Sequence, residues 1–132
     1  MILNVIGILV VVVQYFLNLF IASVKTQIIR QELLSQVQIL DVRELNEFEG
    51  PLGRIPDAKL IPLNQLVSRF EELDFSIPIV AVCRSGARSA QAVMHLKRLG
   101  FTKLANLSGG MLRWNVGGYP VLGNTDRTVF ER

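Results

Sequence analysis

The sequence predicts an α/β domain with a mainly parallel central sheet flanked by helices, preceded by one transmembrane helix. Short apolar runs of strand length alternate with segments of helical periodicity from residue 38 to residue 115. This pattern is typical of parallel sheets, whose sites lie beyond the carboxyl ends of the strands. The first 24 residues carry no charged side chain. Since 132 residues suffice for one domain core, we expect a single folded domain after the apolar segment.

The apolar segment at residues 1–24 has the length of a membrane span. As a helix it would extend about 36 Å, and a hydrocarbon layer is roughly 30 Å thick. The segment explains why the chain is 50% hydrophobic, with a mean hydropathy of +0.38, although the remainder is rich in charge. Lys25 and Arg30 follow the segment and no basic residue precedes it. We therefore expect a single-pass membrane protein with its C-terminal domain in the cytoplasm.

A cleavable signal peptide is the competing interpretation of this segment. No Lys or Arg precedes the apolar run, no clear cleavage site ends it, and it exceeds the roughly 7–15 residues of a signal-peptide core. Small and amide residues fall within about 80° of a helical projection. They are Asn4, Gly7, Gln14, Asn18 and Ala22. Such a stripe fits a packing face that forms a homo-oligomer, and equally a span that tolerates a few amides.

Four short apolar runs in the rest of the chain are predicted strands. Residues 25–36 come first and form a linker or a first helix, with apolar side chains at helical spacing. The folded domain is expected at residues 37–122, with a polar tail at 123–132. Its strands are expected at residues 38–42, 58–61, 77–82 and 103–107.

The segments between these strands have helical periodicity. Leu45 and Phe48 lie three apart in a charged stretch that Gly50 ends. Asn64 is the expected N-cap of the second helix, and Gly100 is the expected stop of the third. The helices are expected at residues 43–49, 64–73, 89–99 and 111–115.

Cys83 lies in the turn between a predicted strand and the predicted helix at residues 89–99, where a thiolate is favoured. Backbone N–H groups and the helix dipole point into such a turn. Arg84 and Arg88 add positive charge nearby, and both effects lower a cysteine pKa. Because the thiolate is the nucleophilic form, we expect Cys83 to be catalytic.

Residue counts exclude several classes of function. With one Cys and one His, the chain has no pair of cysteines for a disulfide or a metal site, and we expect neither a metal nor a cofactor. Any adduct on Cys83 must then be discharged to an outside acceptor. The 14 Lys and Arg are mixed with 11 Asp and Glu. No basic face for nucleic acid is evident, and a small anion is the better expected partner.

Four motifs between residues 29 and 121 resemble the rhodanese family of sulfurtransferases. The first is Asp41-Val42-Arg43-Glu44 with Glu47-Phe48, and the second is Gly53-Arg54-Ile55-Pro56-Asp57-Ala58 followed by Ile61-Pro62-Leu63. The third is the loop Cys83-Arg84-Ser85-Gly86-Ala87-Arg88-Ser89, and the fourth is Leu107-Ser108-Gly109-Gly110-Met111 with Trp114. In the second motif the family usually has His and Gly where this chain has Arg54 and Asp57. The resemblance implies a rhodanese-like fold for residues 37–122.

The resemblance also implies a persulfide mechanism. The Cys83 thiolate would take sulfane sulfur from an anionic donor such as thiosulfate and pass it to cyanide or a thiol. Loop N–H groups would hold the persulfide, with Gly86 permitting the turn beside Ala87. Arg84 and Arg88 would orient the donor, and Ser85 and Ser89 would add hydroxyl donors.

Other interpretations stay open at this point. The protein could be a membrane-tethered persulfide carrier or binding module without turnover of small donors. Phosphatases and arsenate reductases of related design place Arg six positions after Cys, whereas Ser89 occupies that position here. A lone cysteine after a strand is more often a buried apolar side chain. Asp41 and Arg43 support the site or serve only the structure. Trp114 is expected to pack, and His95 is expected on the helix surface or at the edge of the core.

Overall fold

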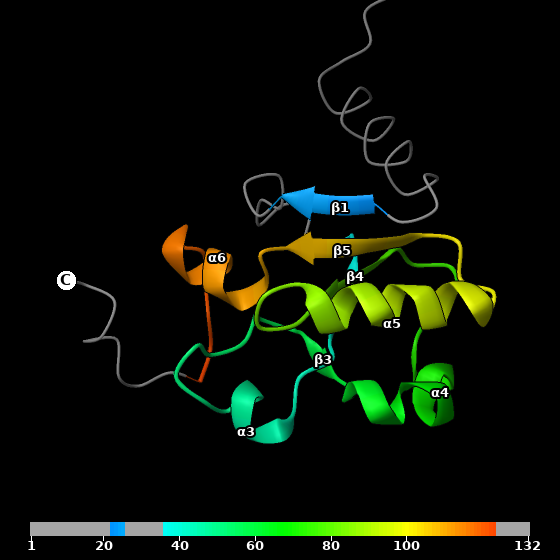
Figure 1. Cartoon of the computed structure of the whole chain (residues 1–132), viewed down its shortest axis with the longest axis horizontal. Helices are drawn as coiled ribbons and strands as arrows, with labels where there is room; N and C mark the ends of the chain where they lie inside the picture. Colours follow the sequence, from blue (N-terminus) through cyan, green and yellow to red (C-terminus); the bar gives the residue numbers. More distant parts are fainter. Residues whose placement is uncertain (1–21, 26–35, 124–132) are drawn as a thin grey trace, which may run out of the picture.

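A five-stranded parallel sheet forms the centre of the protein, in a computed structural model that describes residues 22–25 and 36–123. Its strands lie in the order β1-β5-β4-β2-β3. They are β1 (Ala22–Lys25), β2 (Gln38–Asp41), β3 (Lys59–Leu60), β4 (Ile79–Val82) and β5 (Leu104–Ser108). Every neighbouring pair is parallel, so the carboxyl ends of all strands lie at the same end of the sheet. Figure 1 shows β1 and β5 side by side with the same direction. The predicted α/β fold with a parallel central sheet is confirmed.

The helices follow the predicted order, with shifted boundaries. They are α3 (Leu45–Phe48), α4 (Leu66–Arg69) between the 3-10 turns η2 (Leu63–Gln65) and η3 (Phe70–Glu72), α5 (Ala87–Arg98) and α6 (Gly110–Val116). The N-cap of η2 is Pro62 and not, as predicted for the second helix, Asn64. Pro62 has a non-helical backbone (φ −54°, ψ 145°), and the helical turn begins at the next residue, so Asn64 already lies inside it. Helix α5 begins at Ala87, two residues before the predicted start.

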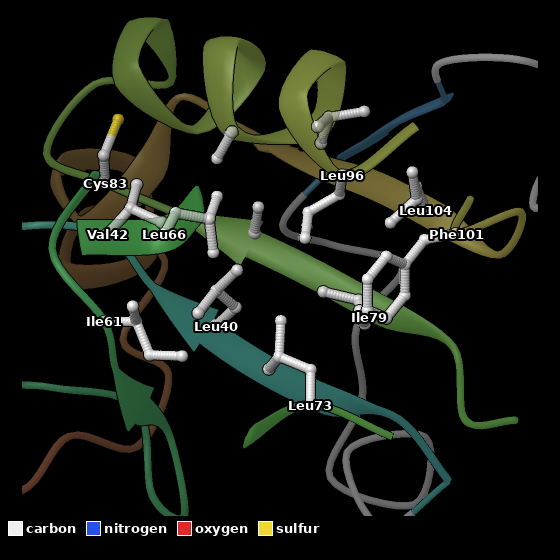
Figure 2. Close-up of a cluster of buried hydrophobic side chains, with 13 residues drawn as sticks. Leu40, Val42, Ile61, Leu66, Leu73, Ile79, Cys83, Leu96, Phe101 and Leu104 are labelled. Atoms are coloured by element: carbon white, nitrogen blue, oxygen red, sulfur yellow. The ribbon is translucent and has the colours of Figure 1, made fainter. Parts of the chain in front are cut away.

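Alternation along the strands sends side chains to two separate cores. Ile79, Ala81 and Cys83 belong to the cluster packed beneath α5, and Figure 2 shows Cys83 at one end of it. Val80 and Val82 belong to the opposite cluster, which contains Trp114 of α6. This period of two is what a strand dictates. It places the Cys83 side chain on the same face of the sheet as α5.

The predicted transmembrane span does not extend to Val24. Residues 22–25 form β1, which pairs with β5 in the register Ala22↔Ala105 to Lys25↔Ser108. Their backbone groups therefore bond to the sheet, where the prediction placed the end of a helix and the start of a linker. Within residues 22–25 and 36–123, no helix is long and apolar enough to cross a membrane. Residues 1–21 of the predicted span, residues 26–35 of the predicted linker or first helix and residues 124–132 of the predicted tail lie outside the described residues.

Candidate active site

Cys83 follows β4 directly and lies in a tight loop whose backbone faces its sulfur. The side chain is buried, with 1% of its surface exposed. The N–H group of Gly86 donates a hydrogen bond to Cys83 Sγ at 3.0 Å. Gly86 has φ +108°, a conformation that side chains disfavour, and this turn lets the chain enter α5 immediately. The sequence prediction of a glycine-dependent turn around the sulfur agrees with this geometry.

The N-terminus of α6 holds the outer side of the loop. Met111 N–H donates to the Cys83 carbonyl at 2.9 Å, and Leu112 N–H donates to the Arg84 carbonyl at 3.1 Å. A Cβ atom at Gly110 would lie 2.6 Å from the Arg84 carbonyl oxygen, closer than real Cβ atoms approach. The Gly109-Gly110 pair therefore serves a close approach between α6 and the loop. This close approach lets N–H groups of α6 satisfy the carbonyls of Cys83 and Arg84.

The hydrogen-bond donors of the loop lower the Cys83 pKa. Burial alone pushes the pKa of this thiol upward, but the Ser89 hydroxyl and the N–H groups of Ser89, Gly86 and Ser85 outweigh burial. The net pKa lies below the ordinary value for a cysteine. A thiolate at this position is the form that attacks sulfur or other electrophiles.

Arg88 is committed to an ion pair with α3. Its Nη1 and Nη2 donate to the two Glu47 carboxylate oxygens, each at 2.7 Å. This pair is the largest cause that raises the Arg88 pKa, and the Cys83 thiolate adds a smaller effect. It also lowers the Glu47 pKa to about 2. Glu47 belongs to the first sequence motif, but it was not predicted as a site residue.

The remaining loop side chains are placed differently. Arg84 and Ser85 are exposed, and Ala87 is the exposed first residue of α5. In the described part of the chain, the Arg84 guanidinium has no hydrogen bond or ion pair. Arg84 is therefore the loop cation that an incoming anion can pair with.

Asp41 and Arg43 form a buried ion pair behind α3. Arg43 Nη2 lies 2.7 Å from Asp41 Oδ2, and the two side chains are 1% and 0% exposed. The same guanidinium donates to the carbonyls of Glu47 at 3.1 Å and Gly53 at 2.8 Å. Within the described residues, each guanidinium nitrogen of Arg43 thus has a protein acceptor. The geometry favours the structural role over contact with a donor, and it sets the position of Glu47.

Asn106 is a buried site residue that sequence reasoning missed. It lies on β5 with 7% of its surface exposed. The Ser89 hydroxyl donates to Asn106 Oδ1 at 2.6 Å, and Asn106 Nδ2 donates to the Gly86 carbonyl at 3.0 Å. The available signal was an amide inside the apolar run at residues 104–107, because a buried amide needs hydrogen-bond partners.

The two departures from the family motif lie near α3 and the loop that follows it. The Arg54 guanidinium lies 5.0 Å from the centre of the Phe48 ring, a cation–π contact. Asp57 has φ +64°, a conformation that favours the glycine usual at this position in the family motif.

Trp114 is fully buried and its indole N–H donates to the Pro120 carbonyl at 2.9 Å, which agrees with a packing role. In residues 22–25 and 36–123 no cluster of His, Cys, Asp and Glu could hold a metal.

The fold and the site together define a class of protein. It is an α/β protein with a parallel sheet and a buried cysteine in a strand-to-helix loop, where backbone N–H groups face the sulfur. Within that class, this chain belongs to the rhodanese-like family, whose domain model matches residues 25–116.

Relatives and solved structures agree with this assignment. A sulfurtransferase of Allochromatium vinosum is 36% identical over 86 residues, which cover 65% of this chain and 78% of that protein. The uncharacterized protein YqhL of Bacillus subtilis is 42% identical over 79 residues, and the match covers 60% of this chain but only 61% of YqhL. The crystal structure of a rhodanese-related protein from Thermoplasma volcanium has a TM-score of 0.70 and 30% identity, covering 77% of this chain and 98% of that one.

Proposed function

We propose that this protein is a sulfurtransferase that transfers sulfane sulfur through a persulfide on Cys83. The observation that carries the proposal is that the Cys83 sulfur is buried among N–H donors, which lower the pKa of this thiol. In the first step, the thiolate attacks the outer sulfur of thiosulfate. A new S–S bond forms on Cys83, the S–S bond of thiosulfate breaks, and sulfite leaves with the electron pair. In the second step, cyanide or a thiolate takes the outer sulfur, and the electron pair returns to Cys83.

The loop has groups that can stabilise the negative charge present at each of these steps. The donor carries two negative charges, and Arg84 is the exposed cation of the loop that can pair with it. The N–H groups of the loop stabilise the negative charge of the thiolate before attack and of the persulfide afterward. Ser85 is exposed beside them and can donate to an oxyanion at the mouth of the loop.

A persulfide carrier that accepts sulfur from a protein donor is the second candidate. The observation that favours it is the pairing of Arg88 with Glu47, which removes one cation from those available to a small dianion. A carrier requires the same persulfide but little turnover with thiosulfate. Phosphatase or arsenate chemistry is disfavoured because Arg88 follows Cys83 by five positions and is already paired.

Mass spectrometry after thiosulfate treatment tests the persulfide. We expect one added sulfur atom, released by cyanide as thiocyanate and absent in Cys83→Ser. Saturable turnover with thiosulfate and cyanide supports the enzyme, whereas a stable persulfide without turnover supports the carrier. A chain that gains no sulfur from thiosulfate or from a persulfide donor contradicts both.

We also propose that residues 1–21 anchor the protein in a membrane, with the rhodanese-like domain on the cytoplasmic side. The uncharged apolar sequence before Lys25 supports this proposal. Protease added outside intact cells should leave the domain uncut, and digestion of the domain would contradict the orientation.

The stripe of small and amide residues in this segment makes self-association testable. Gln14→Leu with Asn18→Leu should reduce the oligomer size in detergent, and an unchanged size would contradict a packing face.

A further inference from the structure

The Ser89 hydroxyl lies between two acceptors but has only one proton. Its oxygen is 2.6 Å from Asn106 Oδ1 and 3.3 Å from Cys83 Sγ. All three side chains are buried, with no more than 7% of their surfaces exposed. Since a hydroxyl donates one hydrogen bond, it satisfies either the amide oxygen or the sulfur at any moment. The shorter contact is the one to Asn106.

The orientation of the Asn106 amide is set by the Gly86 carbonyl. This carbonyl can only accept, and the Asn106 side-chain atom 3.0 Å from it must therefore be the NH₂ group. The amide oxygen then faces Ser89 and can only accept. When the Ser89 hydroxyl makes the longer contact, it donates to Cys83 Sγ; when it makes the shorter one, its proton points to Asn106 and its oxygen presents a lone pair to Cys83.

This arrangement suits a Cys83 sulfur that bears no charge. A neutral thiol can donate its proton to the Ser89 oxygen, while Gly86 N–H donates to the sulfur. A thiolate has no proton to donate, and a hydroxyl lone pair aimed at it is repulsive. The hydroxyl must then turn toward the sulfur, which leaves the buried Asn106 oxygen without its donor.

We infer that Asn106 is a positioning residue that competes with Cys83 for the Ser89 proton, so that one hydroxyl follows the negative charge through sulfur transfer. This inference rests on the proposed persulfide chemistry for its role in the cycle. It assigns to Asn106 a function that changes the chemistry of the loop, in addition to holding the Gly86 carbonyl.

The charge moves between two sulfur atoms during the cycle. In the resting thiolate the charge is on Sγ, and the Ser89 hydroxyl donates to it. After attack on the donor, Sγ becomes a neutral sulfur with two bonds, the charge is on the outer sulfur, and the hydroxyl returns to Asn106. When the acceptor removes the outer sulfur, the electron pair of the S–S bond returns to Sγ and the hydroxyl turns back. No proton enters or leaves the network in these steps.

The charged groups around the loop would not produce the change in the Cys83 pKa that this competition predicts. Arg88 interacts with the thiolate from α5, but Glu47 of α3 pairs with it. Arg84 is exposed at the surface of the loop. Asp41 and Arg43, which follow the neighbouring strand β2, pair with each other. Substitution of Ser89 or Asn106 leaves all of these charges in place.

The Cys83 pKa in a cycle of variants tests the inference. Ultraviolet absorbance of the thiolate as a function of pH measures this pKa, and the chain has only one cysteine. With Ser89 present, Asn106→Val should lower the pKa by about one unit, because the hydroxyl then donates only to sulfur. Ser89→Ala should raise the pKa by about one unit, and the double variant should match Ser89→Ala. Gln38→Val, which removes a strand amide bonded to the Asp74 and Ile77 carbonyls, is the control and should leave the pKa unchanged.

A purely structural role for Asn106 predicts the opposite sign. Loss of its bond to the Gly86 carbonyl would loosen the loop, weaken the donor to Sγ and raise the Cys83 pKa. An unchanged or raised pKa in Asn106→Val, or a lowering that persists with Ser89→Ala, therefore overturns the inference.

The S–H infrared band of the native chain provides a test that needs no Asn106 variant. Below the thiol pKa, the Cys83 S–H group should donate to Ser89, so its band should lie at lower wavenumber than in Ser89→Ala. The same wavenumber in both proteins contradicts the inference. Neither measurement requires sulfur transfer. If the network behaves as expected but no persulfide forms, only the proposed function fails; if a persulfide forms but the network does not respond, only this inference fails.

Discussion

Glu47 binds Arg88 through two hydrogen bonds of 2.7 Å, which couples α3 to the first turn of α5. The same carboxylate accepts the Glu44 N–H at 2.9 Å and so also caps its own helix. Arg43 Nη1 donates to the Glu47 carbonyl from the other side. The position of Arg88 beside the cysteine loop thus depends on the buried pair at the end of β2. The Glu47 carboxylate also neutralises most of the positive charge of Arg88.

Glu47→Gln should increase the reaction with thiosulfate. The amide keeps an acceptor for the Glu44 N–H and for Arg88, but it removes the negative charge that cancels the guanidinium. One uncancelled charge near the loop mouth is worth about 1 kcal/mol, so kcat/KM for thiosulfate should rise roughly fivefold. Glu72→Gln, in the exposed pair with Arg69, is the matched control. Equal or lower kcat/KM in Glu47→Gln would show that Arg88 does not act on the donor.

Stability should fall in acid as Glu47 is protonated. The pKa of Glu47 drops from its ordinary value of 4.5 to about 2, chiefly because Arg88 hydrogen-bonds to it. A lowered pKa contributes stability that is present above pH 4.5 and is lost as the pH falls toward 2. Urea unfolding across this window should therefore show a shallower pH dependence in Glu47→Gln. The Glu72 pKa is also about 2, because of Arg69, so the comparison is made in a Glu72→Gln background. An unchanged slope would mean that the ion pair does not form in solution.

Gly110→Ala should damage both the fold and the loop. The new Cβ would meet the Cys83 and Arg84 carbonyls, which are backbone atoms and cannot move aside without moving the sulfur. We expect a loss of about 1–3 kcal/mol in the free energy of unfolding, measured in urea, together with a higher Cys83 pKa. Gly100→Ala is the control, since Gly100 also has a positive φ but no atom lies within 4 Å of its Cβ position. Equal effects in the two variants would point to backbone strain alone and contradict the role of close approach.

Much of this architecture could be predicted from local sequence, because period and punctuation are local signals. The apolar run at 77–82 predicted β4, and the spacing of Val93, Leu96 and Leu99 predicted α5. β1 was missed because its first three residues, 22–24, continue an uncharged apolar stretch, and no turn signal separates them from it.

The site was predictable where its parts are neighbours in the chain. Cys83, Gly86 and Ser89 lie within seven residues, and their motif indicated the loop. Glu47 and Asn106 were not predicted as site residues, although Glu47 belongs to the first motif and Asn106 is an amide inside an apolar run. They reach the loop from 41 and 17 positions away, and only the folded sheet and helices bring them there.

Arg43→Met should be strongly destabilising, and Asp41→Asn added to it should recover part of the loss. Arg43 and Asp41 are both buried, so removal of the guanidinium leaves an unpaired buried carboxylate, at a cost of about 3–5 kcal/mol. Neutralising Asp41 as well removes that charge, although the Glu47 and Gly53 carbonyls still lose their donor. Urea unfolding of the two single variants and the double variant measures the coupling. A structural pair also predicts that the folded fraction of Asp41→Asn keeps its KM for thiosulfate. A large rise in that KM without loss of stability would instead place Asp41 and Arg43 in contact with the donor.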